Sequence, residues 1–138
     1  MYYQSFPGQT GNSISSEKLE ALRFPDLAGK RFLDVGCNEG YFCGYASFSG
    51  ATESVGLDQS KVAIRKAQKR FPQCAFHNQS WDRLPEGSFD VILLASALHY
   101  AEDQEALVHQ LMSKLTPNGL LILEVGIAQG GKANFCKS

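Results

Sequence analysis

Five short apolar runs alternate with segments of helical periodicity along this chain. The runs lie at residues 31–35, 54–58, 74–78, 91–95 and 120–125, and each has the length of a strand. Helical spacing of apolar positions is found in residues 41–49, 61–70 and 103–115. Because buried parallel strands are apolar on both sides and are joined by helices, this alternation predicts an α/β fold with one parallel sheet covered on both faces.

The rest of the chain divides into an arm before this core and a tail after it. Residues 1–30 are rich in Gly, Pro and aromatics at first and then show a helical pattern, so we expect an N-terminal arm and a short helix. Ser15 or Ser16 can cap that helix, and Pro25 ends it. Residues 31–125 form the expected core, and residues 126–138 form a C-terminal tail.

The stretch RFLDVGCNEGYFCGYA, residues 31–46, predicts a strand, a tight turn with Gly36 and Gly40, and a helix. In an open α/β sheet such a turn binds a ligand, because the backbone can approach closely and the helix start has free N–H groups. Asp58 ends the second run, as in dinucleotide-binding domains. Asn38 replaces the second glycine of that pattern, and asparagine tolerates the left-handed backbone that such a turn needs.

Charge around this turn favours a cationic ligand over a pyrophosphate. No Lys or Arg lies between Phe32 and Ser60. The acids in the same stretch are Asp34, Glu39, Glu53 and Asp58. A site of this sign suits an ammonium or sulfonium centre better than two phosphates.

Composition limits the class of protein further. With 138 residues and 43% hydrophobic content, the chain is long enough for one packed domain, and its net charge of -1 gives no general attraction to nucleic acid or membranes. It shows no signal-peptide pattern and no apolar stretch near the roughly 18 residues of a membrane span, so we expect a cytoplasmic protein. Its four cysteines form no CxxC pair, which favours free thiols and no metal site.

Four motifs in order carry a resemblance to a known family: LDVGCNEGYF, VGLD, SFDVILLASALHY and LTPNGLLILEV. Over residues 31–125 they resemble the motif series of the class I S-adenosylmethionine-dependent methyltransferases. The resemblance implies a Rossmann-like, doubly wound, mostly parallel sheet of about five strands in the order 3-2-1-4-5. The family's last two strands, an antiparallel pair, do not fit into residues 126–138 and are expected to be missing. The edge of the fifth strand would then be covered by the tail, a second copy in a homodimer, or an additional C-terminal segment.

The resemblance also implies a binding site for S-adenosylmethionine and its product S-adenosylhomocysteine. Asp34 would lie near the amino end of the methionine moiety, and it has a structural alternative, which is to hold the amides of the turn. The backbone of Gly36, Cys37 and Gly40 would wrap the same moiety. Asp58 would accept hydrogen bonds from both ribose hydroxyls, which the two oxygens of a carboxylate allow.

The adenine end of the expected site is assigned in the same way. Gln59 would lie beside the adenine. Ser80 falls where many family members have an acid that contacts the adenine amino group, and a hydroxyl is a weaker acceptor. Trp81 would cover the purine face, with ordinary core packing as the alternative.

The expected acceptor side follows the fourth strand. Methyl transfer from a sulfonium needs mainly the alignment of two reactants, and a base helps where the acceptor must lose a proton. His99 is the candidate catalytic base, and a local hydrogen-bonding role is its alternative. Ser96, which we also count among the donor-binding residues, shares this loop with Tyr100. Glu124 at the end of the fifth strand opens toward the same side.

We therefore expect methyl transfer to an O, N or C nucleophile of a small-molecule acceptor, such as a sugar or a natural product. Three alternatives stay open: a non-catalytic adenosyl-binding or interaction module, a tRNA-modifying methyltransferase, and a nicotinamide-dinucleotide domain. The basic residues within residues 61–70 are interpreted as a solvated helix face, with a phosphate-binding patch as the alternative. Balanced charge argues against nucleic acid as a partner.

Overall fold

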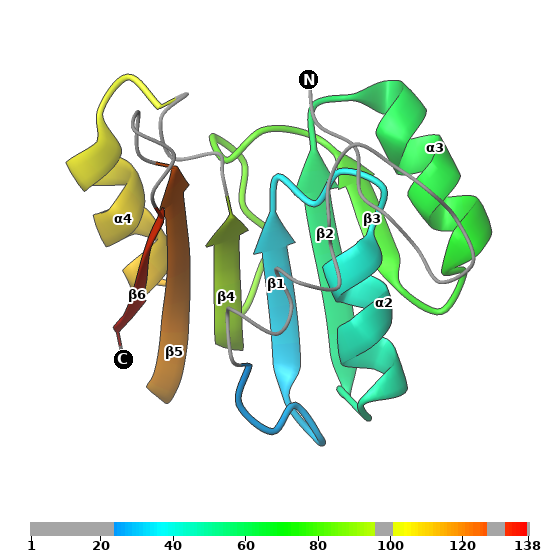
Figure 1. Cartoon of the computed structure of the whole chain (residues 1–138), viewed down its shortest axis with the longest axis horizontal. Coiled ribbons are helices and arrows are strands. Elements are labelled where there is room, and N and C mark those ends of the chain that lie inside the picture. The colour runs from blue at the N-terminus through cyan, green and yellow to red at the C-terminus, as the bar shows by residue number, and fades with distance from the viewer. Residues whose placement is uncertain (1–23, 96–100, 127–131, 138) are drawn as a thin grey trace.

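A computed structural model describes residues 24–95, 101–126 and 132–137 (Figure 1). Its elements are β1 (Arg31–Val35), α2 (Tyr41–Phe48), β2 (Glu53–Asp58), α3 (Lys61–Arg70), β3 (Ala75–Asn78), β4 (Phe89–Ala95), α4 (Gln104–Met112), β5 (Leu115–Gly126) and β6 (Lys132–Lys137). The expected alternation of strands and helices is confirmed. Residues 1–23 of the predicted N-terminal arm, and with them most of its short helix, lie outside the described residues. None of the described helices is long and apolar enough to span a membrane.

The strands form one sheet with the order β3-β2-β1-β4-β5-β6. β1 pairs in parallel with β2 and with β4, and the pairs β2–β3 and β4–β5 are parallel as well. The predicted order 3-2-1-4-5 is therefore confirmed. Because these strands run in the same direction, their carboxyl ends lie along one edge of the sheet, at the top of Figure 1.

The tail adds a sixth, antiparallel strand beside the five parallel strands that were expected. β6 pairs antiparallel with β5, from Leu121 opposite Lys137 to Gly126 opposite Lys132. An antiparallel strand can return beside its neighbour after a short connection, whereas the expected pair of strands requires more chain than residues 126–138 contain. The edge of β5 was expected to be covered by the tail, a second copy or an additional segment. In the structure, the tail covers it as β6.

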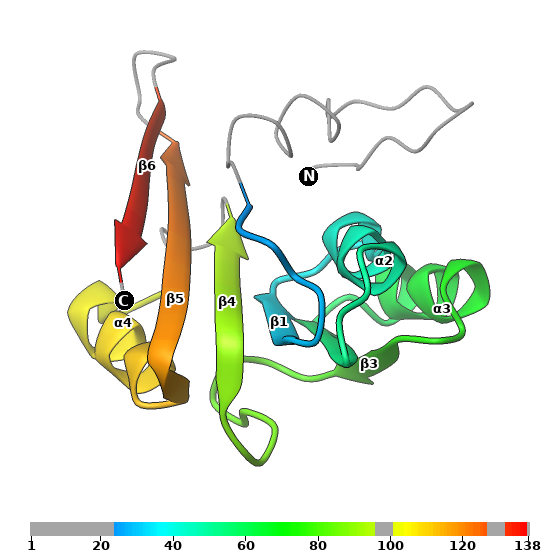
Figure 2. The same ribbon diagram turned by 90° about the horizontal axis from the view of Figure 1, so that it is seen from below.

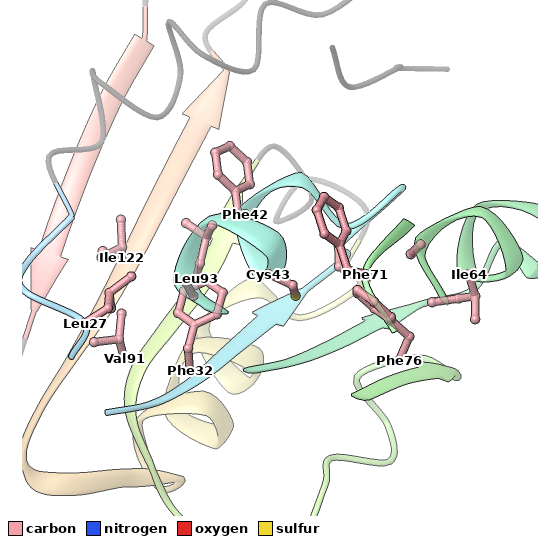
Figure 3. Packing of buried hydrophobic residues seen from close by; sticks show 13 residues of the cluster. Leu27, Phe32, Phe42, Cys43, Ile64, Phe71, Phe76, Val91, Leu93 and Ile122 are labelled. Carbon is pink, nitrogen blue, oxygen red and sulfur yellow. The ribbon is translucent and has the colours of Figure 1, made fainter. Parts of the chain in front are cut away.

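Two apolar clusters cover the two faces of the sheet. α2 and α3 pack on one face and α4 packs on the other (Figure 2). The first cluster includes Phe32 of β1, Phe42 of α2 and Ile64 of α3 (Figure 3). In the second, Leu107 and Leu111 of α4 are buried against β4 and β5. Helices on both faces were expected, and they hold the strand ends in fixed positions.

A glycine in α2 allows its backbone to approach the end of α3. A Cβ at Gly44 would lie 2.3 Å from Cε1 of the Phe71 ring, and the Phe71 side chain is buried. Atoms cannot approach this closely, so the ring occupies the space that a side chain on Gly44 would need. This contact fixes α2, and the turn before it, relative to α3.

The start of β5 contains an irregularity that the apolar pattern did not predict. The register with β4 changes from Phe89 opposite Leu115 to Val91 opposite Leu120, so several residues bulge out of β5. The sequence Pro-Asn-Gly at residues 117–119 lies in this bulge. Asp90 between the two register positions accepts hydrogen bonds from Arg31 N at 2.8 Å and from Thr116 Oγ1 at 2.9 Å, and thereby ties β1, β4 and β5 together.

Candidate functional site

The first part of the site is the turn between β1 and α2, residues 36–40, which folds onto the end of β2. Gly36 N and Cys37 N both donate to the carbonyl oxygen of Leu57, at 2.8 Å and 2.7 Å. Asp34 lies two residues before the turn, opposite Gly56 of β2, and only 1% of it is exposed. The predicted strand, turn and helix are confirmed, and the turn has one fixed position relative to β2.

Asp58 connects this turn to the start of α3. Its Oδ2 accepts a hydrogen bond from Asn38 N at 2.8 Å, and its Oδ1 accepts one from Ser60 N at 2.8 Å. Asn38 has a φ of 54°, the left-handed conformation that asparagine was predicted to allow. Ser60 is the N-cap of α3, and its hydroxyl accepts from Ala63 N at 3.2 Å. The Asp58 carboxylate therefore connects the loop after β1 with the loop after β2.

The turn ends at Gly40, which packs directly on α3 and β3. Gly40 has a φ of 86°, and a Cβ there would lie 2.8 Å from Cζ of Phe76 and 3.0 Å from Cβ of Ala67. Both the backbone conformation and the lack of space require glycine. Beside it, the Glu39 carboxylate lies 3.8 Å from Lys66 Nζ of α3. Lys66 could not be found from the sequence, because no local signal links residues 39 and 66.

The thiol of Cys37 lies among these acids but has a structural role. A hydrogen bond with Cys43 lowers the pKa of the Cys37 thiol, but burial and the charges of Asp34 and Asp58 raise it more, so the net pKa is above its ordinary value. Burial raises the pKa of the Cys43 thiol well above its ordinary value. Both thiols are therefore protonated at neutral pH and are not nucleophiles. The backbone N–H of Cys37 helps to hold the turn at residues 36–40 on β2.

The loop after β3 supplies the next residues on the same edge of the sheet. Asn78 Nδ2 donates to the carbonyl oxygen of Asp58 at 3.0 Å, which joins the ends of β3 and β2. Ser80 Oγ donates to Asp82 Oδ2 and accepts from Asp82 N, both at 3.2 Å. Many members of the resembled family have an acid where this chain has Ser80, and here the acid in contact with Ser80 is Asp82. Asp82 was not predicted as a site residue because it lies two residues after the position at which the family's acid was expected.

Trp81 lies partly buried against the cluster on the α4 face of the sheet. Its carbonyl oxygen accepts a hydrogen bond from Gln110 Nε2 of α4 at 3.2 Å. These contacts favour the packing interpretation of this side chain. Gln59 follows Asp58 and is exposed.

The acceptor side is described only in part. The candidate base His99, with Ser96 and Tyr100, lies outside the described residues. Glu124 is 2% exposed, and in the sheet it lies opposite Ala95 at the carboxyl end of β4. Among the described residues, no group of three or more His, Cys, Asp or Glu side chains is placed to hold a metal ion.

These features define a class of protein. The strand order reverses between β1 and its neighbours β2 and β4, and open parallel sheets bind ligands beyond the carboxyl ends of strands at such a point. The turn at residues 36–40 and the acid at the end of β2 are at this point. The chain is thus a doubly wound α/β domain, and the ends of β1 and β2 form its candidate ligand site.

Comparisons with known proteins identify the family. The chain belongs to the methyltransferase domain family, whose model matches residues 9–131. A solved S-adenosylmethionine dependent methyltransferase from Mesorhizobium loti is similar at 28% identity with a TM-score of 0.72, covering 87% of this chain and 64% of that one.

Two curated relatives have related sequences. An uncharacterized protein of Haemophilus influenzae is 32% identical over 121 residues, covering 80% of this chain and 48% of the relative. A tRNA U34 carboxymethyltransferase of Idiomarina loihiensis is 28% identical over 119 residues, covering 80% of this chain and 37% of the relative. The chain thus spans about half or less of the length of these two relatives.

Proposed function

We propose that this chain binds S-adenosylmethionine at the ends of β1 and β2 and transfers its methyl group to an O, N or C nucleophile of a small-molecule acceptor, sugar-like or natural-product-like. The observation that carries the proposal is the position of Asp58. Its two oxygens each accept one backbone N–H, at 2.8 Å. A carboxylate has about four acceptor positions, so two are left for the two hydroxyls of a ribose.

The other donor-binding residues are proposed around this acid. The backbone of Gly36, Cys37 and Gly40 holds the methionine moiety, and Asp34 supplies negative charge on the buried side of the turn. When bound, the donor supplies an electrophilic methyl group on a sulfonium. The acids of this site attract that cation, and they would repel a pyrophosphate, which is why a dinucleotide is the weaker candidate.

Three further residues of the donor site are proposed at its adenine end and beside the acceptor. They are Gln59 and Ser80 at the adenine, and Ser96 after β4. Trp81 remains a proposed adenine contact with its packing role as the competing interpretation. His99 is proposed as the base that removes a proton from the acceptor, and Tyr100 and Glu124 as residues that line the acceptor side.

Calorimetry separates the ligand classes. We expect the protein to bind S-adenosylhomocysteine and S-adenosylmethionine and not NADH, and binding of NADH alone would overturn the proposal. Incubation with methyl-labelled donor and a cell extract then tests turnover, with label expected in the small-molecule fraction. Donor binding without any labelled product would instead support the non-catalytic module.

A second candidate function, methylation of RNA, is favoured by α3. Lys61, Arg65 and Lys69 are exposed and follow at intervals of four residues, so they line one stripe of this helix. Within the described part of the chain, none of these three side chains forms an ion pair. Such a stripe suits a phosphate backbone, and similarity to the tRNA U34 carboxymethyltransferase supports the same candidate.

The labelling experiment decides between the two acceptors. Label in the RNA fraction, lost when Lys61, Arg65 and Lys69 are all replaced by Gln, would support the second candidate. Label in small molecules that the triple replacement leaves unchanged would support the first.

We also propose a cytoplasmic location and either a homodimer or a further C-terminal segment at the edge of the sheet. Cys37, Cys43 and Cys74 are free thiols, as a reducing compartment favours. β6 is the last strand of the sheet, and its outer edge is where another strand can pair. Light scattering across protein concentrations tests the dimer, which predicts twice the mass of the chain.

A further inference from the structure

Two neighbouring residues of α3 contact two neighbouring residues of the turn at residues 36–40. Lys66 Nζ lies 3.8 Å from Glu39 Oε2, and the next residue, Ala67, lies against Gly40. The two side chains of the ion pair differ in exposure, with 18% for Glu39 and 59% for Lys66. The carboxylate is therefore mostly enclosed, while the ammonium reaches it from the helix surface.

This ion pair is the second electrostatic connection between the turn and α3. The first is Asp58, which accepts from Asn38 N in the turn and from Ser60 N at the start of α3. Asp58 fixes the middle of the turn, and Lys66 fixes its last part, just before α2 begins. Without Lys66, the negative charge of Glu39 would have no cation among the described ion pairs.

We propose that Lys66 is a positioning residue for the donor, because its pairing with Glu39 holds the turn at residues 36–40 in the conformation that binds. The proposal rests on the proposed function, since it assumes that this turn wraps the donor. Lys66 itself contacts no donor atom in this scheme and acts through Glu39. A second consequence is that Lys66 neutralises one of the acids around the turn, so the site is less negative than the local sequence indicates.

The test measures the dissociation constant of S-adenosylhomocysteine by calorimetry for a set of matched variants. Lys66→Met removes the charge and keeps the length of the side chain. Lys66→Arg keeps the charge, and Lys69→Met removes a charge from the same exposed helix without touching the pair. The combined variant Glu39→Lys with Lys66→Glu exchanges the two charges. Circular dichroism verifies that each variant folds, which the 59% exposure of Lys66 favours.

We expect Lys66→Met to bind S-adenosylhomocysteine about threefold more weakly at low salt, with Lys66→Arg and Lys69→Met near wild type. The difference should shrink in 0.5 M salt because ions screen a partly exposed pair. The charge exchange should recover at least half of the lost affinity, because it restores an ion pair between positions 39 and 66 and so shows that the effect acts through this pair.

Two outcomes would overturn the inference. One is an unchanged dissociation constant in Lys66→Met, and the other is an equal loss in Lys69→Met. Failure of the wild-type protein itself to bind S-adenosylhomocysteine is a different result, since it would overturn the proposed function first and this inference with it.

Discussion

Replacement of Asp58 tests the assignment of the site most directly, because this carboxylate has a structural role and a proposed binding role. In Asp58→Ala, the N–H groups of Asn38 and Ser60 lose their acceptor. Water can replace it at Ser60, which is exposed, but less easily at the partly buried Asn38. An unsatisfied N–H of this kind costs about 1–3 kcal/mol, which corresponds to a fall in Tm of roughly 4–12 °C for a domain of this size.

The effect on the donor should be larger than the effect on stability. Loss of two hydrogen bonds from ribose hydroxyls to a charged, partly exposed acceptor costs about 3 kcal/mol in total, or roughly 150-fold in the dissociation constant. Asp58→Asn keeps one acceptor oxygen and should lose about tenfold. The assay is calorimetry with S-adenosylhomocysteine, together with a thermal melt of each variant.

Glu105→Gln is the matched control for charge, since this acid lies on α4 with a side chain that is 88% exposed. It should bind as wild type does. The reasoning fails if folded Asp58→Ala binds within about threefold of wild type, or if Glu105→Gln loses as much affinity as Asp58→Ala.

Three further outcomes are expected from packing and burial. Gly44→Ala should lower the free energy of unfolding, measured in urea, by about 1–3 kcal/mol, because the new Cβ would lie 2.3 Å from the Phe71 ring. Alanine favours helices more than glycine does, so equal or greater stability of the variant would contradict this packing. The pKa of Asp90 is lowered from 3.8, chiefly by the hydrogen bond from Arg31 N, so its stabilising effect is present at neutral pH and is lost as the pH falls below that value. Asp90→Asn should therefore reduce stability at pH 7 and flatten the decline in acid, and parallel melting profiles of the two proteins across this range would exclude it. Iodoacetamide should label the partly exposed Cys74 before the buried Cys43, which peptide mass spectrometry can measure, and the reverse order would show that the burial is wrong.

Features that depend on residues close in the chain could be predicted from the sequence. The strands were predictable because a run of buried apolar residues is a local signal, and the sheet order came with the family's motif series. Asn38 was expected to replace a glycine, and its φ of 54° confirms that it takes the left-handed conformation. Asp58 was expected at the end of β2, and it is the last residue of that strand.

Features that depend on what another part of the chain provides could not be predicted in this way. The sequence KANFCK of β6 lacks the apolar run of a buried strand, and it pairs because β5 has an edge beside it. The bulge in β5 arises where the register with β4 changes, and Asp90, which takes hydrogen bonds from β1 and from the bulge, stabilises it. The edge of β5 and the carboxylate of Asp90 belong to other segments of the chain than the residues that they stabilise. They therefore produce no periodic pattern in the sequences of β6 or of the bulge.

Lys66 shows most clearly why charge has to be counted in space. Along the chain, the stretch from Phe32 to Ser60 contains acids and no base, which indicated a strongly negative site. In the fold, α3 crosses beside the turn and brings an ammonium within 3.8 Å of Glu39. In the proposed site, Asp34 and Asp58 are then the acids assigned to the donor. If that count is correct, removal of the Glu39 charge should affect donor affinity only through the shape of the turn, so Glu39→Gln with Lys66→Met should be no weaker than Lys66→Met alone.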